Sequence, residues 1–536
     1  MNNKILIITA LLLAGFYSCD YPVSTGAGCH DTILFSDTIQ YHPVRTCRED
    51  GSILPWFSAD IGASYDTALM LVWDFWHKME VDSNGLKYYM NHQVWSQEHD
   101  MRGLGGDQIN MALSSWRLLY AYTGNPAVVE DMQYIADNYL ERSLSEPGDK
   151  WPHIPYPYNT EIHSGRYDGD MRNGKGITQP DKAGTFGYEL VNLYKITGQN
   201  KYLDAARLIA GTLSSYVKKG DSARSPLPFR VNAKTGETGS LFDNMGSGKK
   251  VSPALYTSNW TGTLMLFEEL SMLDPQNRDN YKDAFNTIIE WMKEYPLKTN
   301  KWGPFFEDIP GWSDTQTNAV SFATFIMQHR EIFPRWKEDV KGIFDWTYRE
   351  LGNHEYEKYK VVVMNEQTVY RVPGNSHSSR QASAELMYAR LSGDTSYTVN
   401  AIRALNWATY TVADDGRNRY IRDDIWLTDG YGDYVRHYIR AMEATPELAP
   451  GHRNRFLGTT SVITSIDYKP DAIKYSTYSP ANDVLRLTTK PAKIISSGKR
   501  LKEVRNESEE GYMWRRLNSG GELKIFHSGN KIEIIL

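Results

Sequence analysis

From about residue 65 onward, apolar residues recur along the chain at intervals of three and four positions. This spacing predicts a succession of amphipathic helices. The junctions between helices repeat one pattern, in which an apolar helix end is followed by a short turn and a new helix. Gly124, Gly198 and Gly393 occupy three of these turns, and Asp274-Pro275 occupies another. Glycine supplies the left-handed conformation that ends a helix, so the pattern predicts one helical hairpin used repeatedly.

The repeats amount to six hairpins, which predict a mainly α fold, an (α/α)6 toroid whose inner ring is formed by the second helix of each pair. The first helices are expected to begin near Tyr65, Ala127, Tyr202, Asn280, Trp336 and Tyr397, and the second near Gly106, Ala183, Thr261, Thr317, Ser378 and Gly430. A helical solenoid is the competing geometry. The long, irregular connections within the pairs favour the toroid, because each leads from an outer to an inner helix and all gather at one rim.

The two ends of the chain depart from this pattern. After about Gly451 the apolar runs become short and β-like, with Gly, Asn, Ser or Pro between them, which predicts a small antiparallel β-domain over residues 451–536. At the start, Lys4 precedes an apolar run over residues 5–16 that is too short for a permanent membrane span. We therefore expect a signal over residues 1–19, a tether over 20–59 and the toroid over 60–450.

The cysteines fit an exported protein. The signal resembles that of a bacterial lipoprotein, in which Cys19 would be lipidated; cleavage by a general signal peptidase is the alternative. Cys29 and Cys47 can form one disulfide in an oxidising compartment, or remain as two thiols. The expected location is therefore the cell envelope, with contact to a membrane only through the lipid anchor.

Composition narrows the class of ligand. The formal net charge of -6 gives no sign of a nucleic-acid partner. The chain has 15 Trp and 35 Tyr, and aromatic rings suit sugar-binding clefts because the C–H face of a pyranose packs on them. Packing within a large helical protein explains the same rings. No spacing has the look of an EF-hand or zinc site, so we expect neither a metal nor a cofactor.

Carboxylates recur on the segments that enter the inner helices. Cleavage of a glycosidic bond needs one carboxylic acid to protonate the leaving oxygen and often a second carboxylate to activate water or attack carbon. Capping of a helix start by a carboxylate is the competing explanation, and it is favoured for Asp107. The carboxylates concerned are Asp100, Asp107, Asp181, Glu307, Asp308 and Asp314.

Two stretches are similar to unsaturated glucuronyl hydrolases and related glucuronidases within the (α/α)6 carbohydrate-active enzymes of Bacteroidetes-type lipoproteins. "HDMRG" places His99-Asp100 before the first inner helix, and "QPDKAGTFGYELVNLYKITGQNKY" places Asp181 at the start of the second. The resemblance implies catalysis by Asp100 and Asp181, with His99 and Arg102 in the binding site. "SNWTGTLMLF" matches the tryptophan of the family's third motif at Trp260 but lacks its arginine.

Two further segments carry candidate substrate-binding residues. The longest connection, residues 151–184, contains His163, Arg166 and Tyr167, and a guanidinium binds a carboxylated sugar through two hydrogen bonds. A solvated loop with chance charges is the alternative.

Asn375 and His377 precede the fifth inner helix, and Tyr431 precedes the last. Asn375 and His377 resemble the arrangement in toroidal polysaccharide lyases, which use asparagine to neutralise a uronate before β-elimination, and Tyr167, Tyr431 or Tyr434 could complete it. Capping of the helix by Ser376 to Ser379 is the alternative.

We therefore expect a glycoside hydrolase that acts on a uronic-acid-containing oligosaccharide or polysaccharide. A lyase that cleaves a uronate by β-elimination and a non-catalytic glycan-binding lipoprotein are the alternatives. In each case the expected partner is an acidic saccharide.

Overall fold

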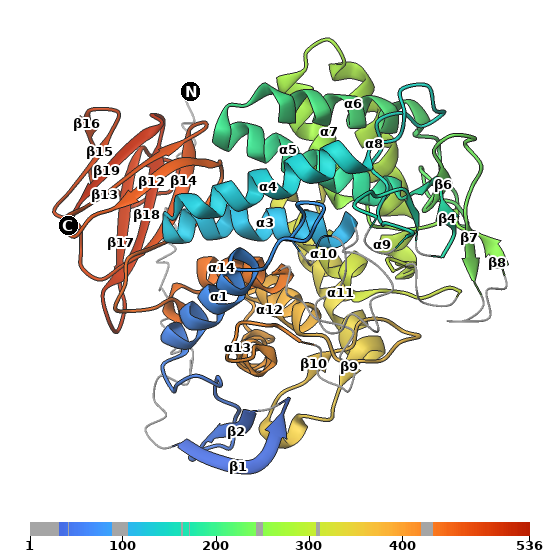
Figure 1. Cartoon of the computed structure of the whole chain (residues 1–536). Helices are drawn as coiled ribbons and strands as arrows, with labels where there is room; N and C mark the ends of the chain where they lie inside the picture. The colour runs from blue at the N-terminus through green and yellow to red at the C-terminus, as the bar shows by residue number, and fades with distance from the viewer. Residues whose placement is uncertain are drawn as a thin grey trace, which may run out of the picture.

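The structure is a computed structural model (Figure 1), and it describes residues 32–40, 42–87, 90, 106–161, 164–170, 172–242, 250–306, 311–419 and 432–536. Among these residues, six helices form a closed circuit in which each packs against the next and the last packs against the first. In order they are α3 (Gly106–Thr123), α5 (Pro180–Thr197), α7 (Thr261–Leu273), α10 (Gln316–Gln328), α12 (Asn375–Ser392) and α14 (Asp433–Ala444). The fold is mainly helical, as predicted, and we call these six helices the ring.

A second layer of helices surrounds the ring, and each packs chiefly against one ring helix. These are α1 (Ile61–His77), α4 (Pro126–Ser143), α6 (Asn200–Tyr216), α8 (Arg278–Glu294), α11 (Trp336–Leu351) and α13 (Thr398–Ala408). All twelve helices begin within four residues of the positions predicted from the sequence. The short helices are α9 (Pro296–Thr299), η2 (Arg330–Ile332), η3 (Glu357–Tyr359), η4 (Thr409–Thr411) and η5 (Pro446–Leu448).

The glycine turns at the ends of the ring helices have the predicted conformation. Gly124, Gly198 and Gly393 have φ values of 69°, 70° and 80°, in the left-handed region that L side chains disfavour. Gly124 also lies against the C-terminal part of the chain, where a Cβ atom would come within 2.9 Å of the Tyr468 ring.

The connections that enter the ring helices contain short two-stranded pairs. They are β3 (Gly169–Asp170) with β4 (Gly174–Lys175), β5 (Ile177–Thr178) with β6 (Val231–Asn232), β7 (Ser240–Phe242) with β8 (Lys250–Pro253), and β9 (Gly352–Asn353) with β10 (Val363–Met364). These pairs fix the long connections beside the N-terminal ends of the ring helices.

The C-terminal region forms two antiparallel sheets, as the β-like runs predict. One sheet has the order β11-β14-β18-β17 and the other β12-β13-β19-β15-β16. The strands are β11 (Arg455–Thr459), β12 (Ile463–Tyr468), β13 (Ala472–Thr477), β14 (Ala481–Leu487), β15 (Lys493–Ser496), β16 (Lys499–Arg500), β17 (Gly511–Arg516), β18 (Gly521–His527) and β19 (Lys531–Ile535).

These sheets lie against the end of the ring at which its helices finish (Figure 1). The hydroxyl of Tyr468 donates to the carbonyl of Ala121 at 2.9 Å, near the end of α3. Arg455 forms an ion pair with Asp66 of α1 at 3.0 Å. The sheets cover this end of the ring. A site is therefore expected at the opposite end, where the ring helices begin.

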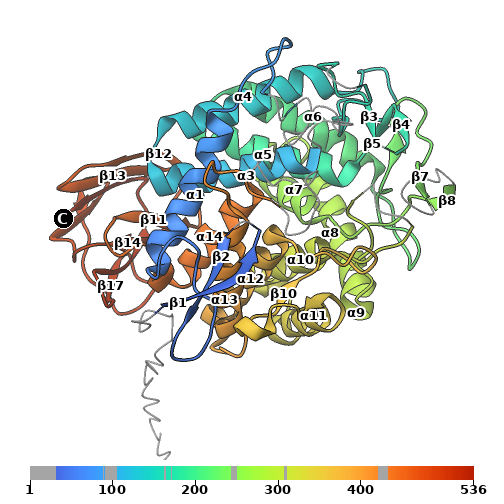
Figure 2. The same ribbon diagram turned by 60° about the horizontal axis from the view of Figure 1, so that its bottom comes forward.

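The described part of the expected tether is folded. Strands β1 (Thr32–Ile39) and β2 (His42–Cys47) form a hairpin that Figure 2 shows beside α13. A ring nitrogen of His42 lies 2.9 Å from the Val412 carbonyl oxygen, and the Arg45 amide donates to the Tyr410 hydroxyl at 2.9 Å. Cys47 is disulfide-bonded, whereas Cys19 and Cys29 lie outside the described residues.

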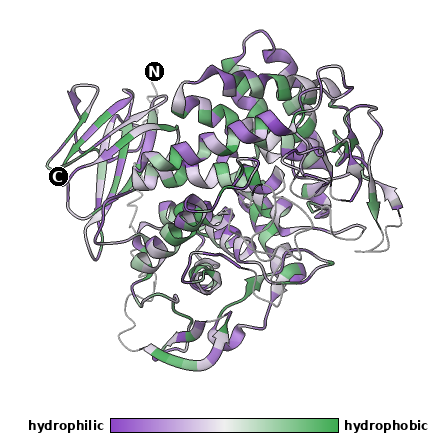
Figure 3. Ribbon diagram, in the orientation of Figure 1, coloured by the Kyte–Doolittle hydropathy of each residue, from purple (hydrophilic) through white to green (hydrophobic). Residues whose placement is uncertain are grey.

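One continuous core of buried apolar side chains joins the helices to the C-terminal sheets. Figure 3 shows hydrophobic and hydrophilic residues interspersed along the helices of both layers. Much of the tryptophan content lies in this core. The largest fully buried side chains include Trp76, Trp116, Trp260, Trp302 and Trp407. No helix among the described residues combines the length and apolar character that crossing a membrane requires.

Candidate functional site at the N-terminal end of the ring

Asp181 lies in the first turn of α5 and is completely buried. Its Oδ2 atom accepts hydrogen bonds from Lys182 Nζ and from Asn259 Nδ2, both at 2.8 Å. Its Oδ1 atom has no partner among the described residues. The side chain therefore does not cap the helix. It is a carboxylate with one oxygen fixed by two donors and the other unused.

An aromatic pair lies beside this carboxylate. Lys182 Nζ donates to the Phe305 carbonyl at 2.7 Å and lies 4.0 Å from the centre of the Phe305 ring. Phe305 is buried, while the adjacent Phe306 is partly exposed. The Phe306 ring centre is 4.8 Å from that of Phe305 and 6.2 Å from that of His377. Phe306 thus lies between the Asp181–Lys182 pair and the first turn of α12.

A buried ion pair holds the connection that leads into α5. Arg230 Nε donates to Asp170 Oδ2 at 2.8 Å, and both side chains are at most 1% exposed. The same oxygen accepts from Gln179 Nε2 at 2.8 Å, and Gln179 is the residue that precedes α5. Burial alone would raise the pKa of Asp170, but Arg230 and the hydrogen-bond donors around it lower that pKa. This pair, which the sequence analysis missed, positions the start of the helix that carries Asp181.

Two arginines share one carboxylate on the other side of the ring. Arg380 Nη2 lies 2.7 Å from Asp433 Oδ2, and Arg436 forms an ion pair with Asp433 Oδ1. Arg380 also donates to Gln316 and Thr317, each at 3.1 Å. Burial alone would raise the pKa of Asp433, but Arg436 and Arg380 outweigh it and hold that pKa well below its usual range.

Two buried histidines adjoin this cluster. His377 is in the first turn of α12, and neither ring nitrogen has a hydrogen-bond partner among the described residues. Burial, assisted by Arg380, lowers the pKa of His377 to about 3. His437 Nε2 lies 3.5 Å from Asp433 Oδ1, and burial lowers its pKa well below 6.5. Both imidazoles are therefore neutral at pH 7, a form that can accept a proton at one nitrogen and donate one from the other.

Two predicted binding residues, Asn375 and Trp260, are buried and donate hydrogen bonds to other parts of the protein. Asn375 is fully buried, and its amide donates to Asn418 Oδ1 at 2.7 Å. Trp260 is also buried and donates to the Thr257 carbonyl at 2.7 Å. The Asn375 amide and the Trp260 indole are thus engaged within the protein.

Tyr167 and Arg166 lie near the outer helix α4. Tyr167 is buried, its hydroxyl bonds the Met90 carbonyl, and its ring packs edge-on against Tyr139 of α4. Arg166 is exposed, and the preceding Gly165 accepts a hydrogen bond from Arg142 of α4.

The remaining predicted residues lie outside the described part of the chain: His99, Asp100, Arg102, His163, Glu307, Asp308 and Tyr431. Asp107 is described, and it lies within the first turn of α3.

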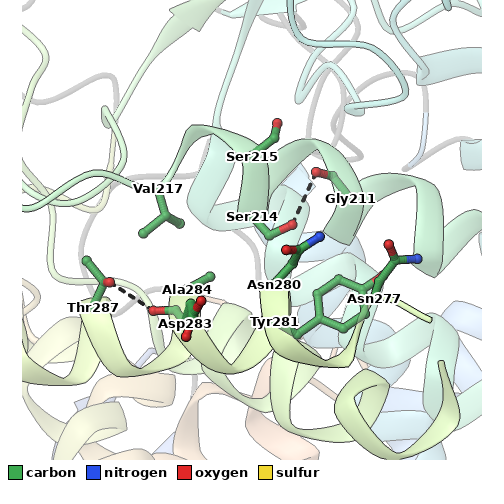
Figure 4. Close-up of a pocket in the computed structure, with 10 residues that line it drawn as sticks. All are labelled: Gly211, Ser214, Ser215, Val217, Asn277, Asn280, Tyr281, Asp283, Ala284 and Thr287. Carbon is green, nitrogen blue, oxygen red and sulfur yellow. Dashed lines mark hydrogen bonds between the residues drawn. The ribbon is translucent and has the colours of Figure 1, made fainter. Parts of the chain in front are cut away.

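A pocket of about 420 Å³ lies away from this end of the ring, between α6 and α8 (Figure 4). Asp283 is the one carboxylate among its lining residues. Ser214 and Thr287 donate to the backbone carbonyls of Gly211 and Asp283, and the Tyr281 hydroxyl donates to Asp274 Oδ2 at 3.0 Å. The pocket thus lacks the combination of charged groups found at the ring.

The described residues contain no group of three or more His, Cys, Asp or Glu side chains arranged to hold a metal ion.

Comparison with known proteins shows which solved structures share the fold of this chain. No family model matches it. A stretch of 175 residues is 27% identical to mannosyl-oligosaccharide alpha-1,2-mannosidase IA of Drosophila melanogaster, covering 32% of this chain and 24% of that protein. The match thus spans about a quarter of that relative's length.

Among solved structures, cellobiose 2-epimerase from Spirochaeta thermophila superposes with a TM-score of 0.52 at 12% identity, over 72% of this chain and 97% of that one. A D-mannose isomerase superposes with a TM-score of 0.50 at 10% identity, over the same shares. At these identities the likeness shows a shared fold and leaves activity open. An unsaturated glucuronyl hydrolase specific for heparin has a lower TM-score of 0.43 at 11% identity, over 73% of this chain and 99% of that one.

Proposed function

We propose that the protein is a carbohydrate-active enzyme of the (α/α)6 type, and specifically a glycoside hydrolase that acts on a uronic-acid-containing saccharide. The observation that carries this proposal is the environment of Asp181. A carboxylate with one oxygen fixed by Lys182 and Asn259 and the other free suits a general base or nucleophile in glycoside cleavage.

Phe306 supplies a surface for the sugar. Its partly exposed ring lies between the Asp181–Lys182 pair and His377. A pyranose packed on this ring would be held between the two polar groups, since apolar C–H faces stack on aromatic rings while hydroxyls bond polar neighbours.

The charge of the site favours an acidic saccharide. Among the described residues, Arg380 and Arg436 share the carboxylate of Asp433, so this part of the site has one positive charge in excess when His437 is neutral. Anionic ligands are attracted to such a surplus, which supports a uronate over a neutral sugar. The matches to a mannosidase and to sugar epimerases support carbohydrate chemistry in general.

Epimerisation or isomerisation of a sugar is the second candidate. It is favoured by His377 and His437, because of two neutral imidazoles one can take a proton from a carbon while the other gives a proton to the opposite face of that carbon, or to its neighbour. The solved structures with this fold include an epimerase and an isomerase.

The test is to incubate the protein with acidic and neutral oligosaccharides and to analyse the products by mass spectrometry and chromatography. A hydrolase adds the mass of one water across the cleaved bond. An epimerase or isomerase leaves the mass unchanged and alters the retention of the sugar. A β-elimination lyase produces an unsaturated uronate, and its appearance would contradict both candidates. Binding without any product would support a glycan-binding role instead.

A further inference from the structure

The segment that carries Phe305 and Phe306 is held in place by side chains. Residues 301–305 belong to no helix or strand, and each of their five carbonyl oxygens accepts a hydrogen bond from a side chain. Most hydrogen bonds in proteins join one backbone group to another, so five successive carbonyls that bond side chains are unusual. The position of this segment is therefore set by the side chains that bond it.

Three of the five donors come from one run of sequence, residues 256–258, which lies just before α7. The run and the segment are in close contact, since a Cβ atom on Gly303 would come within 2.7 Å of the Tyr256 ring. Residues 256–258 thus fix the segment over most of its length. The bonds are Tyr256 to Lys301 at 2.6 Å, Ser258 to Trp302 at 2.5 Å, Asn318 to Gly303 at 3.1 Å, Thr257 to Pro304 at 2.8 Å and Lys182 to Phe305 at 2.7 Å.

The next residue of the run, Asn259, holds Asp181 through the contact of 2.8 Å between its Nδ2 atom and Asp181 Oδ2. The Thr257 hydroxyl lies between these two sets of contacts. It accepts a hydrogen bond from the Asn259 backbone amide at 3.3 Å and donates to the Pro304 carbonyl at 2.8 Å. One hydroxyl therefore connects the residue that fixes Asp181 to the segment that carries Phe306.

We propose that Thr257 is a positioning residue, which sets the place of the Phe306 ring relative to the Asp181 carboxylate and so determines how tightly the site binds a sugar ring. The inference rests on the proposed function, because it takes Phe306 as the surface for the sugar. Thr257 is completely buried. It therefore acts through Asn259 and Pro304, and not by contact with a ligand.

The test compares two substitutions of Thr257 by steady-state kinetics on a saccharide that the protein turns over. Thr257→Val keeps the shape but removes the hydroxyl, and among the described residues it leaves the Pro304 carbonyl only the longer bond of 3.3 Å from Asn318. It should raise KM by about threefold to tenfold, the range expected for loss of stacking on the ring itself. Thr257→Ser keeps the hydroxyl and should keep the KM of the wild type, even though loss of a buried methyl group lowers its Tm.

The matched control is Thr212→Val on the outer helix α6. Thr212 is also buried, and its hydroxyl donates to the Pro152 carbonyl at 2.7 Å. This variant loses the same kind of bond away from the site, so its KM should be unchanged. An unchanged KM in Thr257→Val, or an equal rise in Thr257→Ser, would overturn the proposal, because KM would then not depend on the hydroxyl.

Combining Thr257→Val with Phe306→Ala shows whether Thr257 acts through the ring. If it does, Thr257→Val should add no further increase in KM once the ring is gone, since the effects of coupled residues are not additive. The same increase in KM with and without the Phe306 ring would show that Thr257 acts by another route, and would overturn the proposal.

Hydrogen exchange measured by mass spectrometry tests the positioning without a substrate. The Gly303 amide donates to Asp314 Oδ1 at 2.8 Å, so a peptide that contains it reports opening of the segment. Its exchange should be faster in Thr257→Val than in the wild type, Thr257→Ser and Thr212→Val. Unchanged exchange would overturn the proposal. Absence of turnover in the wild type would instead count against the proposed function, and the exchange rates would still decide whether Thr257 positions the segment.

Discussion

Asn259 Nδ2 lies 2.8 Å from Asp181 Oδ2, and this contact joins the start of one ring helix to the segment that enters the next. Asn259 precedes α7, and Asp181 is in the first turn of α5. The amide and the Lys182 ammonium together occupy one carboxylate oxygen and leave the other unpartnered. A carboxylate fixed in this way is oriented before any ligand binds, which is what preorganised catalysis needs.

Asp181→Asn should lower kcat by about 10²–10⁴-fold on whichever saccharide the protein turns over, the usual contribution of a group that transfers protons. The variant should keep the circular dichroism spectrum of the folded protein, although it loses stability because the buried Lys182 ammonium is left without its counter-ion. Asp107→Asn is the matched control, since Asp107 is also an acidic residue in the first turn of a ring helix. Loss of turnover in Asp107→Asn with normal turnover in Asp181→Asn would reverse the assignment.

Phe306→Ala should raise KM by about threefold to tenfold, because stacking on an aromatic ring contributes about 0.5–1.5 kcal/mol. Phe306→Tyr should keep KM near that of the wild type. Phe285→Ala on the outer helix α8 is the control, since Phe285 is likewise partly exposed but packs against Phe325. Steady-state kinetics on a saccharide that the protein turns over measures KM for each variant. An unchanged KM in Phe306→Ala would show that this ring does not bind the substrate.

The arrangement of helices could be predicted from the sequence because its signals are local. The apolar spacing and the glycine turns at Gly124, Gly198 and Gly393 can each be recognised in a short stretch of sequence. The helices accordingly begin close to the expected positions. The same holds for the C-terminal strands, whose short apolar runs are bounded by turn residues.

The site could be predicted only in part, because its contacts join distant positions. A short motif predicts Asp181 as a site residue, but no local pattern indicates that Asp170 pairs with Arg230, sixty residues later. The contact of Lys182 with Phe305 spans a still longer separation. The burial of individual side chains could not be predicted from the sequence either. Asn375 is of a residue type that can bind a sugar, yet its amide donates to Asn418 inside the protein.

Asp170→Asn should destabilise the fold by about 3–5 kcal/mol, the usual cost of removing one partner from a buried ion pair, because Arg230 is left buried without its counter-ion. Chemical denaturation monitored by circular dichroism measures the change in the free energy of unfolding. Asp204→Asn is the control: its partner Arg207 is partly exposed, and surface pairs contribute about 0–1 kcal/mol. Equal losses in the two variants would contradict the structural role of Asp170.

Glu385→Gln should make the protein more stable than the wild type at alkaline pH. Glu385 is buried in α12, where it accepts a hydrogen bond from Gln381 Nε2 at 2.8 Å, and burial raises its pKa from 4.5 to about 8. The folded state therefore holds this proton up to about pH 8, while the unfolded state releases it near pH 4.5. Over that interval the wild type loses stability as pH rises, by up to about 1.4 kcal/mol for each pH unit.

Below about pH 4.5 both states of the wild type carry the proton, so the Glu385 contribution no longer varies with pH, and above about pH 8 the loss is complete. Glutamine keeps the shape of the protonated acid and has no proton to lose, so Glu385→Gln should remove this component of the slope. Denaturation curves from pH 4 to 9 measure the difference between the two proteins. Glu350→Gln, a surface carboxyl paired with Arg349 on α11, should leave the slope unchanged. Parallel curves for wild type and Glu385→Gln across this range would show that Glu385 is ionised in the folded protein.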